Sequence, residues 1–469
     1  MEWKILQNET QKLPADGNDY SVKATAKTCT SLNWFGILFC ADSLHSPKSG
    51  YLFRLMDDGH TELLRFSDEP KNTTKLQTRI GETPIDGHSY QLRIEKSGSV
   101  YRGYIRDVTD EKLTDSQDTG EEPWPVFEFP LKAARGRLAA VVGDTVLDNS
   151  EHKTKTGLQI ESCDSTNTTG CAIKTYQNPI LAGYADPDVL YYQGTYYLYA
   201  TSSTLKTGYE AYASKDLVNW EYAGVVMGEA WGMGQCYWAP DIMERNGKFY
   251  ILASVNEHLG IATSDSPLGP FVPEPNYLFD KSIDGHFLID DDGSVYIYYV
   301  SWREEKTYAL YGMKMENDCV TPILSTETLL IEAKEEWECQ KAPVAEAPYI
   351  IKHKGKYYLT YSGSHYESKG YAVGYATSDQ PLGPYKKYEA NPILSYHYLV
   401  HGPGHHCIVT SPDGRDLFIL YHTHHDTKEV QPRSLCIDRM RFTSVSGKED
   451  KLEVYGPTVT PQPYPLLRE

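Results

Sequence analysis

The chain has 469 residues, more than one ordinary hydrophobic core holds, so two domains are the default expectation. A hydrophobic content of 40% with 37 tyrosines is typical of a globular protein, and no apolar run approaches the roughly 18 residues of a membrane helix. The formal net charge of −19 repels nucleic acid and anionic lipid. We therefore expect a neutral ligand and no nucleic-acid or membrane partner.

The first ten residues, "MEWKILQNET", lack the basic start and the apolar core of a signal peptide. The nine cysteines show no spacing typical of a zinc pair. We expect a cytoplasmic protein, or a secreted one whose export signal has been removed.

The first 165 or so residues read as short strands joined by Gly, Asp and Ser turns, as in "FGILFCADS", "GYLFRLMDD" and "HTELLRFSD". This pattern predicts a separate β-sandwich domain over residues 1–172. The turn-rich "DSTNTTG" then marks the boundary to a second domain over residues 173–469. The first domain resembles concanavalin-like lectin folds, which implies a binding or pocket-shaping role by analogy.

One phrase recurs five times in the second domain: a turn glycine followed by an aromatic or aliphatic strand. The copies are "QGTYYLYATSS" from Gln193, "NGKFYILASVN" from Asn246, "DDGSVYIYYVS" from Asp291, "KGKYYLTYSGS" from Lys354 and "DGRDLFILYHT" from Asp413. Repeats spaced roughly 45 to 60 residues apart are typical of propeller blades, each a four-stranded sheet.

These strands are apolar on both faces, as a sheet covered on both sides by neighbouring sheets requires. Residues 179–460 show no sustained helical period. We predict an all-β protein with a five-bladed β-propeller behind the β-sandwich. The alternative is one large β-sandwich, against which the regular recurrence of the phrase argues.

Four acids precede successive copies of the phrase: Asp186, Asp241, Asp284 and Glu346. An acid at the edge of a strand is often only solvated, and Asp186 alone would favour that reading. A propeller directs the innermost strand of every blade towards a central channel, however. We therefore predict that the four acids occupy equivalent positions and converge there.

In this context the sequence resembles glycoside hydrolase family 43, five-bladed propeller enzymes that cleave arabinose and xylose linkages with inversion. The resemblance covers roughly residues 178–460 and depends on "ADPDV", "YWAPD", "IDGHFLIDDDG" and "AEAPY" in this order. The family usually has "EGP" where this chain has "EAP". That change leaves the acid in place and alters how closely a sugar approaches.

The resemblance implies that Asp186 is the general base, Glu346 the general acid, and Asp241 the carboxylate that orients the acid and tunes its pKa. Asp188 is then structural, and Asp284 belongs with the substrate-binding residues. Inversion requires about 6.5 to 9.5 Å between base and acid, so that a water fits between them. No cofactor is required for this chemistry.

Histidines are frequent near the end of the chain, in "VHGPGHHCIV" and "YHTHHDT". His405 and His406 would face opposite sides of a strand, so they would not bind one ion together. The resemblance assigns His405 to a position beneath the active site that in many members helps to hold a structural calcium ion. It also places Arg433 in the sugar pocket, with a surface salt bridge as the alternative.

Trp238 lies three residues before Asp241, and Trp231 lies in the preceding loop. Aromatic side chains beside catalytic acids often stack on sugar rings, and a buried structural tryptophan is the alternative. We predict that Trp238 lies near the pocket and leave the role of Trp231 open.

The predicted function is release of arabinose or xylose units from plant-type polysaccharides or oligosaccharides. An exo-α-L-arabinofuranosidase is favoured over a β-xylosidase, because many xylosidases of the family carry a sandwich after the propeller and this chain ends soon after "GPTVTPQPYP". The fructan-cleaving relatives are disfavoured, since their "NDPNG" and "RDP" phrases are absent. The alternative is a sugar-binding propeller without activity, which would be expected to lack one of the three acids.

Overall fold

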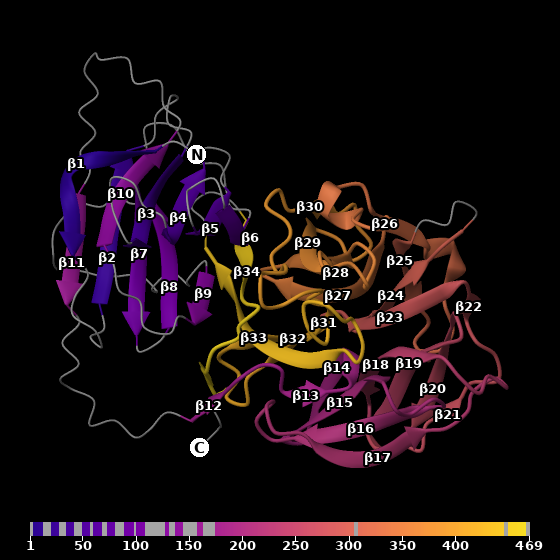
Figure 1. Ribbon diagram of the computed structural model, residues 1–469. Helices are drawn as coiled ribbons and strands as arrows, with labels where there is room; N and C mark the ends of the chain where they lie inside the picture. Colours follow the sequence, from indigo (N-terminus) through magenta and orange to yellow (C-terminus); the bar gives the residue numbers. More distant parts are fainter. Residues whose placement is uncertain are drawn as a thin grey trace. The chain divides into compact units, whose positions relative to one another are not determined.

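The structure is a computed structural model (Figure 1). It describes residues 174–303, 308–444 and 449–465, and before them residues 3–12, 20–27, 34–41, 49–56, 60–67, 73–79, 89–97, 100–107, 127–130, 137–143 and 157–162. The chain divides into two compact units, Met1–Ala172 and Ile173–Glu469.

The described residues form β-strands and two single-turn 3-10 helices, η1 (Leu324–Thr326) and η2 (Glu336–Glu338), with no α-helix among them. The prediction of an all-β protein is confirmed. Within the same residues, none of the helices is long and apolar enough for a membrane crossing.

The first unit contains two antiparallel sheets. One has the order β1 (Trp3–Lys12), β10 (Arg137–Gly143), β3 (Trp34–Ala41), β4 (Ser49–Met56), β5 (Thr61–Ser67) and β6 (Thr73–Arg79). The other has the order β11 (Gly157–Ser162), β2 (Tyr20–Lys27), β7 (Ser89–Ser97), β8 (Val100–Asp107) and β9 (Phe127–Pro130). The buried rings of Phe39 in β3 and Tyr101 in β8 stack with centroids 5.9 Å apart, so the two sheets pack against each other.

The second unit contains five sheets of four or five antiparallel strands. The first sheet contains β14 (Tyr184–Tyr192), β15 (Thr195–Ser202), β16 (Tyr209–Ser214) and β17 (Glu221–Met227), and the second contains β18 (Tyr237–Arg245), β19 (Lys248–Val255), β20 (His258–Ser264), β21 (Val272–Pro273) and β22 (Phe279–Asp280). The third sheet contains β23 (Ser282–Ile289), β24 (Val295–Ser301), β25 (Ala309–Met315) and β26 (Thr328–Glu332). The fourth contains β27 (Ala345–His353), β28 (Lys356–Gly363), β29 (Ala372–Ser378) and β30 (Lys386–Lys387).

The fifth sheet joins the two ends of this unit. It contains β31 (Gly404–Thr410), β32 (Leu417–Thr423), β33 (Ser434–Thr443) and β34 (Lys451–Tyr455), and β33 also pairs with β13 (Leu181–Ala182) from the start of the unit. A separate pair, β12 (Thr175–Tyr176) with β35 (Gln462–Pro463), again joins the beginning of the unit to its end. These pairings hold the last sheet against the first.

Each of the five repeated phrases forms the turn and second strand of one sheet. Their turn glycines, Gly194, Gly247, Gly293, Gly355 and Gly414, have φ between 74° and 80°, a conformation that glycine adopts without steric cost. The second strands carry apolar side chains on both faces, as the neighbours Leu198 and Tyr199 of β15 show, and both faces are buried against neighbouring sheets. Five buried hydrophobic clusters join successive sheets, and one of them joins the last sheet to the first.

The first strands of the five sheets surround a common centre. Strands β14, β18, β23, β27 and β31 each contact the next in this order, and β31 contacts β14 (Figure 1). Side chains that are far apart in the sequence therefore meet where these strands begin.

Candidate active site

Every first strand contains an irregularity near its beginning. Pairing with the second strand is interrupted after Ala185, Trp238, Ile283, Glu346 and Gly404. The residue that follows each of these has a positive φ: 53° at Asp186, 35° at Ala239, 53° at Asp284, 52° at Ala347 and 44° at His405. Such bulges re-aim neighbouring side chains and are frequent beside active sites.

The bulges define two layers of side chains around the common centre. The positive-φ residues and those just before them supply the layer that includes Asp186, Asp284, Glu346 and His405. Pairing resumes at the residues of the second layer, which are Asp188, Asp241, His286, Tyr349 and His406.

A cavity of about 820 Å³ lies over the first layer. Its lining contains six of the seven predicted site residues: Asp186, Trp238, Asp284, Glu346, His405 and Arg433. Other aromatic side chains, among them Trp302, Tyr308 and Tyr366, complete its wall. A concave site with acids and aromatic rings is suited to a sugar, whose hydroxyls need polar partners and whose ring faces are apolar.

Asp186 is buried and surrounded by groups that favour its ionised form. Arg433 donates from Nη1 to Oδ1 at 2.7 Å and from Nη2 to Oδ2 at 2.9 Å. His422 Nδ1 lies 3.0 Å and His405 Nδ1 3.4 Å from Oδ1. Burial alone would raise the pKa of Asp186, but the Arg433 cation and the two imidazoles hold it well below the usual range. Asp186 is therefore a carboxylate at neutral pH.

Glu346 has the opposite environment. Burial and the negative charge of Asp186 raise the pKa of Glu346 to about 7, although a hydrogen bond from Tyr371 opposes the change. Tyr371 donates its hydroxyl proton to Glu346 Oε1 at 2.6 Å. One cavity thus holds two carboxyl groups whose pKa values are displaced in opposite directions, a feature of sites with a separate acid and base.

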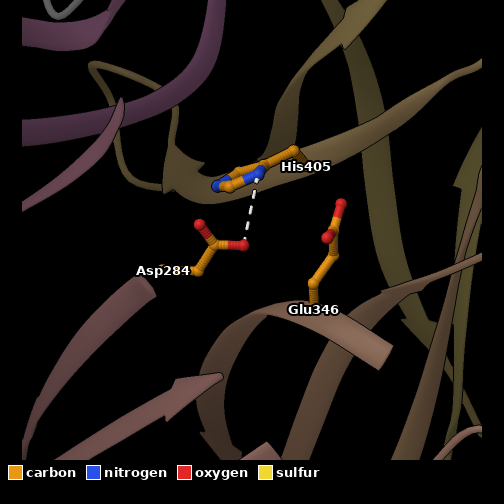
Figure 2. A group of neighbouring side chains, drawn as sticks. All are labelled: Asp284, Glu346 and His405. Carbon is orange, nitrogen blue, oxygen red and sulfur yellow. Dashed lines mark ion pairs between the residues drawn. The ribbon is translucent and has the colours of Figure 1, made fainter. Parts of the chain in front are cut away.

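Asp284 and His405 lie beside Glu346, and Figure 2 shows the three side chains around one space. Each offers one atom to a group whose members lie within 4.8 Å of one another. Burial and the charge of Glu346 raise the pKa of Asp284 well above its usual range, so this pair of carboxyls retains a proton. Burial lowers the pKa of His405 to about 4, and its imidazole is neutral.

These three residues do not match what calcium prefers. Calcium takes about six to eight oxygen ligands. The group supplies three protein atoms, one of them a nitrogen of His405, and the Arg433 cation lies against the adjacent Asp186. His405 instead lies between two acids, with Nδ1 3.4 Å from Asp186 and 3.8 Å from Asp284.

The placement of Asp241 differs from the expectation. This residue belongs to the second layer, does not line the cavity, and accepts hydrogen bonds from His286 Nδ1 at 2.7 Å and from the Phe287 amide at 2.9 Å. Asp188 is its equivalent in the first sheet and accepts from the Ile242 amide at 2.8 Å. Asp241 therefore connects neighbouring strands, and Asp284 occupies the position beside Glu346.

The two tryptophans have different surroundings. Trp238 lines the cavity, as predicted from its place before Asp241. Trp231 donates from Nε1 to the Glu274 carbonyl at 2.9 Å, and its ring lies where a Cβ on Gly260 of β20 would be, so it packs against the second sheet.

Tyr371 and His422 were not foreseen from the sequence. Neither residue belongs to a motif that predicted the acids. Tyr371 contacts Glu346 and His422 contacts Asp186, each from another strand or loop of the unit. The sequence signals for His422 are its place at the end of the fifth repeated phrase and in the histidine-rich "YHTHHDT", and neither pointed to Asp186.

Comparisons with known proteins agree with this geometry. The family model for glycosyl hydrolases family 43 matches residues 176–445. A β-D-galactofuranosidase of Aspergillus niger is 26% identical over 293 residues, which are 56% of this chain and 82% of the relative. A xylosidase/arabinosidase of Bacteroides ovatus is 28% identical over 294 residues, 52% of this chain and 85% of the relative.

Among solved structures, a thermostable family-43 glycoside hydrolase is 37% identical, with a TM-score of 0.58, and the match covers 63% of this chain and 100% of that one. The resemblance read from the four sequence motifs is confirmed. Since the family model matches more than half of its residues, this chain belongs to glycosyl hydrolases family 43 and is a glycoside hydrolase.

Proposed function

We propose that the protein is an inverting glycoside hydrolase that releases single arabinose or xylose units from neutral oligosaccharides or polysaccharides. The observation that carries this proposal is the pair of Asp186 and Glu346 in one cavity, the first with a depressed pKa and the second with a pKa of about 7. An inverting enzyme needs one ionised and one protonated carboxyl in this way.

In the proposed reaction, Asp186 accepts a proton from a water molecule while the water oxygen attacks the anomeric carbon. Glu346 gives its proton to the glycosidic oxygen as the bond between that oxygen and the anomeric carbon breaks. Asp186 ends protonated and Glu346 ionised, and exchange with solvent restores both. The protein groups and water supply both proton transfers, so the proposal requires no cofactor.

Asp284, and not Asp241 as expected, is the carboxyl group that tunes the pKa of the proton donor Glu346. Its carboxyl lies in one group with Glu346 and His405, and two neighbouring carboxyls resist ionising together. We propose that the pair therefore keeps one proton and that this proton is the one the leaving oxygen takes. Arg433 and His422 hold Asp186 ionised and fix its direction.

We propose that the five sheets of the second unit are the blades of a five-bladed β-propeller. The closed series of contacts between their first strands and the pairing of β13 with β33 support this architecture. We propose a β-sandwich for residues 1–172, supported by the Phe39–Tyr101 contact between its two sheets.

For the sugar, we propose an α-L-arabinofuranosyl unit ahead of a β-xylosyl unit. One relative is named a xylosidase/arabinosidase and another a β-D-galactofuranosidase. The names of similar proteins therefore include both pentoses and a sugar with a five-membered ring as substrates. A panel of nitrophenyl glycosides of these sugars tests the choice. Fastest cleavage of the arabinofuranoside supports it, and exclusive cleavage of the xyloside contradicts it.

The alternative is a sugar-binding protein without activity. Proton NMR of the first released sugar tests activity and stereochemistry together. We expect the product anomer opposite to that of the substrate. Release of the same anomer would contradict inversion, and binding without release would favour the alternative.

A further inference from the structure

Tyr371 contacts the acid of the site from outside the cavity. It immediately precedes β29, is fully buried, and is absent from the residues that line the cavity. Its hydroxyl donates to Glu346 Oε1 at 2.6 Å. A group in this position does not line the substrate cavity and acts on the proton donor through this hydrogen bond.

The phenol acts as the donor in this contact. Burial and the charges of Glu346 and Asp186 raise the pKa of Tyr371 well above its usual range, so the hydroxyl keeps its proton. The bond occupies Oε1 and leaves Oε2 of Glu346 to carry the proton that is transferred. It thereby selects which oxygen faces the glycosidic bond.

The Tyr371 ring is held by close packing. It stacks on the His422 ring with centroids 5.6 Å apart and planes at 14°, and His422 itself contacts Asp186. Gly404 also lies against the ring, and a Cβ there would stand 2.3 Å from Tyr371 Cε1. Such a contact is impossible without movement, so glycine at position 404 leaves room for the ring.

We infer that Tyr371 is a positioning residue, which fixes the orientation of the Glu346 carboxyl and sets the pH range over which it remains a proton donor. This inference rests on the proposed role of Glu346. The stack with His422 connects the position of the acid to that of the base, because both rings belong to one packed unit.

The direction of the pH effect follows from the hydrogen bond. Other charged or titratable groups that act on Glu346, or that it acts on, are Asp186, Asp284, Arg433, His405, Tyr308 and Tyr366. Among these influences, the Tyr371 bond favours the ionised carboxylate and lowers the pKa of Glu346. Its removal should raise that pKa and extend activity to higher pH.

The test is Tyr371→Phe, with Tyr361→Phe as a matched control. Tyr361 also donates to a buried glutamate, Glu338, at 2.6 Å, and neither residue lines the cavity. We measure kcat/KM against pH on a nitrophenyl glycoside and on an oligosaccharide of the same sugar, together with Tm. The control should lower Tm and leave both the pH profile and the substrate ratio unchanged.

For Tyr371→Phe we expect the alkaline limb to move to higher pH. We also expect a loss of about 10- to 100-fold on the oligosaccharide, because a proton donor that loses its orientation transfers its proton less well. The loss on the nitrophenyl glycoside should be smaller. An unmoved alkaline limb, or equal losses on the two substrates, would overturn the inference.

Gly404→Ala provides a second variant in case Tyr371→Phe does not fold. Its new methyl group displaces the Tyr371 ring, so the alkaline limb should move in the same direction. Glu346→Gln tests the proton donor separately from Tyr371. If the activity lost in Glu346→Gln is the same for both leaving groups, the proposed function fails. If that loss depends on the leaving group but the loss in Tyr371→Phe does not, only the role of Tyr371 fails.

Discussion

Arg433 forms a two-point ion pair with Asp186, in which Nη1 and Nη2 donate to different carboxylate oxygens at 2.7 and 2.9 Å. The guanidinium comes from the residue just before β33 and the carboxylate from the bulge in β14, so the contact spans 247 positions of the sequence. Asp186 is buried, the Arg433 side chain is 12% exposed, and both groups line the same cavity. An ion pair of this geometry keeps Asp186 ionised and ready to accept a proton.

Arg433→Met should move the acidic limb of kcat/KM to higher pH. Loss of the cation raises the pKa of Asp186, and the base must be ionised to act, so activity disappears first at low pH. Arg433→Lys keeps a positive charge and should restore part of the shift. An acidic limb at the same pH in the Met variant would contradict this account of the ion pair.

Asp284→Asn and Asp241→Asn should have different effects. Asp284 and Glu346 retain one proton between them, and in Asp284→Asn no second carboxylate opposes the loss of that proton, so the alkaline limb should move to lower pH and kcat should fall. Asp241→Asn removes an acceptor for His286 or Phe287 and should lower the free energy of unfolding by about 2 kcal/mol. Its alkaline limb should stay in place. If the alkaline limb moved only in Asp241→Asn, Asp241 and not Asp284 would be the residue that tunes the pKa of Glu346.

Trp238→Ala and Trp231→Ala separate sugar binding from packing. Trp238 lines the cavity, so its loss should raise KM with a small change in Tm. Trp231 packs over Gly260 and donates to the Glu274 carbonyl, so its loss should lower the free energy of unfolding by about 2 kcal/mol and leave KM unchanged. Equal KM values for wild type and Trp238→Ala would remove Trp238 from the sugar site.

The sequence was sufficient to bring Asp186, Asp284 and Glu346 to one site, because glycine followed by an aromatic strand is a local signal. The phrase glycines need positive φ, and their strands need cover on both faces; both requirements are visible in a single repeat. Residues just upstream of the phrases, such as Asp186 and Glu346, could therefore be assigned to one end of the sheets.

Asp241 was misplaced because distance along the chain does not show where a bulge lies. An alignment on the prolines provides the missing signal: Asp186-Pro187-Asp188 corresponds to Ala239-Pro240-Asp241, so Asp241 matches Asp188. The contacts of Tyr371 with Glu346 and of His422 with Asp186 join segments 25 and 236 positions apart, and no local pattern predicts them. They follow only from the packing of neighbouring sheets.

The most direct test of the account compares Glu346→Gln with Asp186→Asn on two substrates that carry the same sugar, a nitrophenyl glycoside and an oligosaccharide. Glu346→Gln should abolish cleavage of the oligosaccharide and retain more activity on the nitrophenyl glycoside, because protonation of a poor leaving group contributes about 10²- to 10⁴-fold and a nitrophenolate hardly needs it. Asp186→Asn should impair both substrates alike, since water must be activated in either case. Equal losses on the two substrates for Glu346→Gln would contradict the assignment of Glu346 as proton donor.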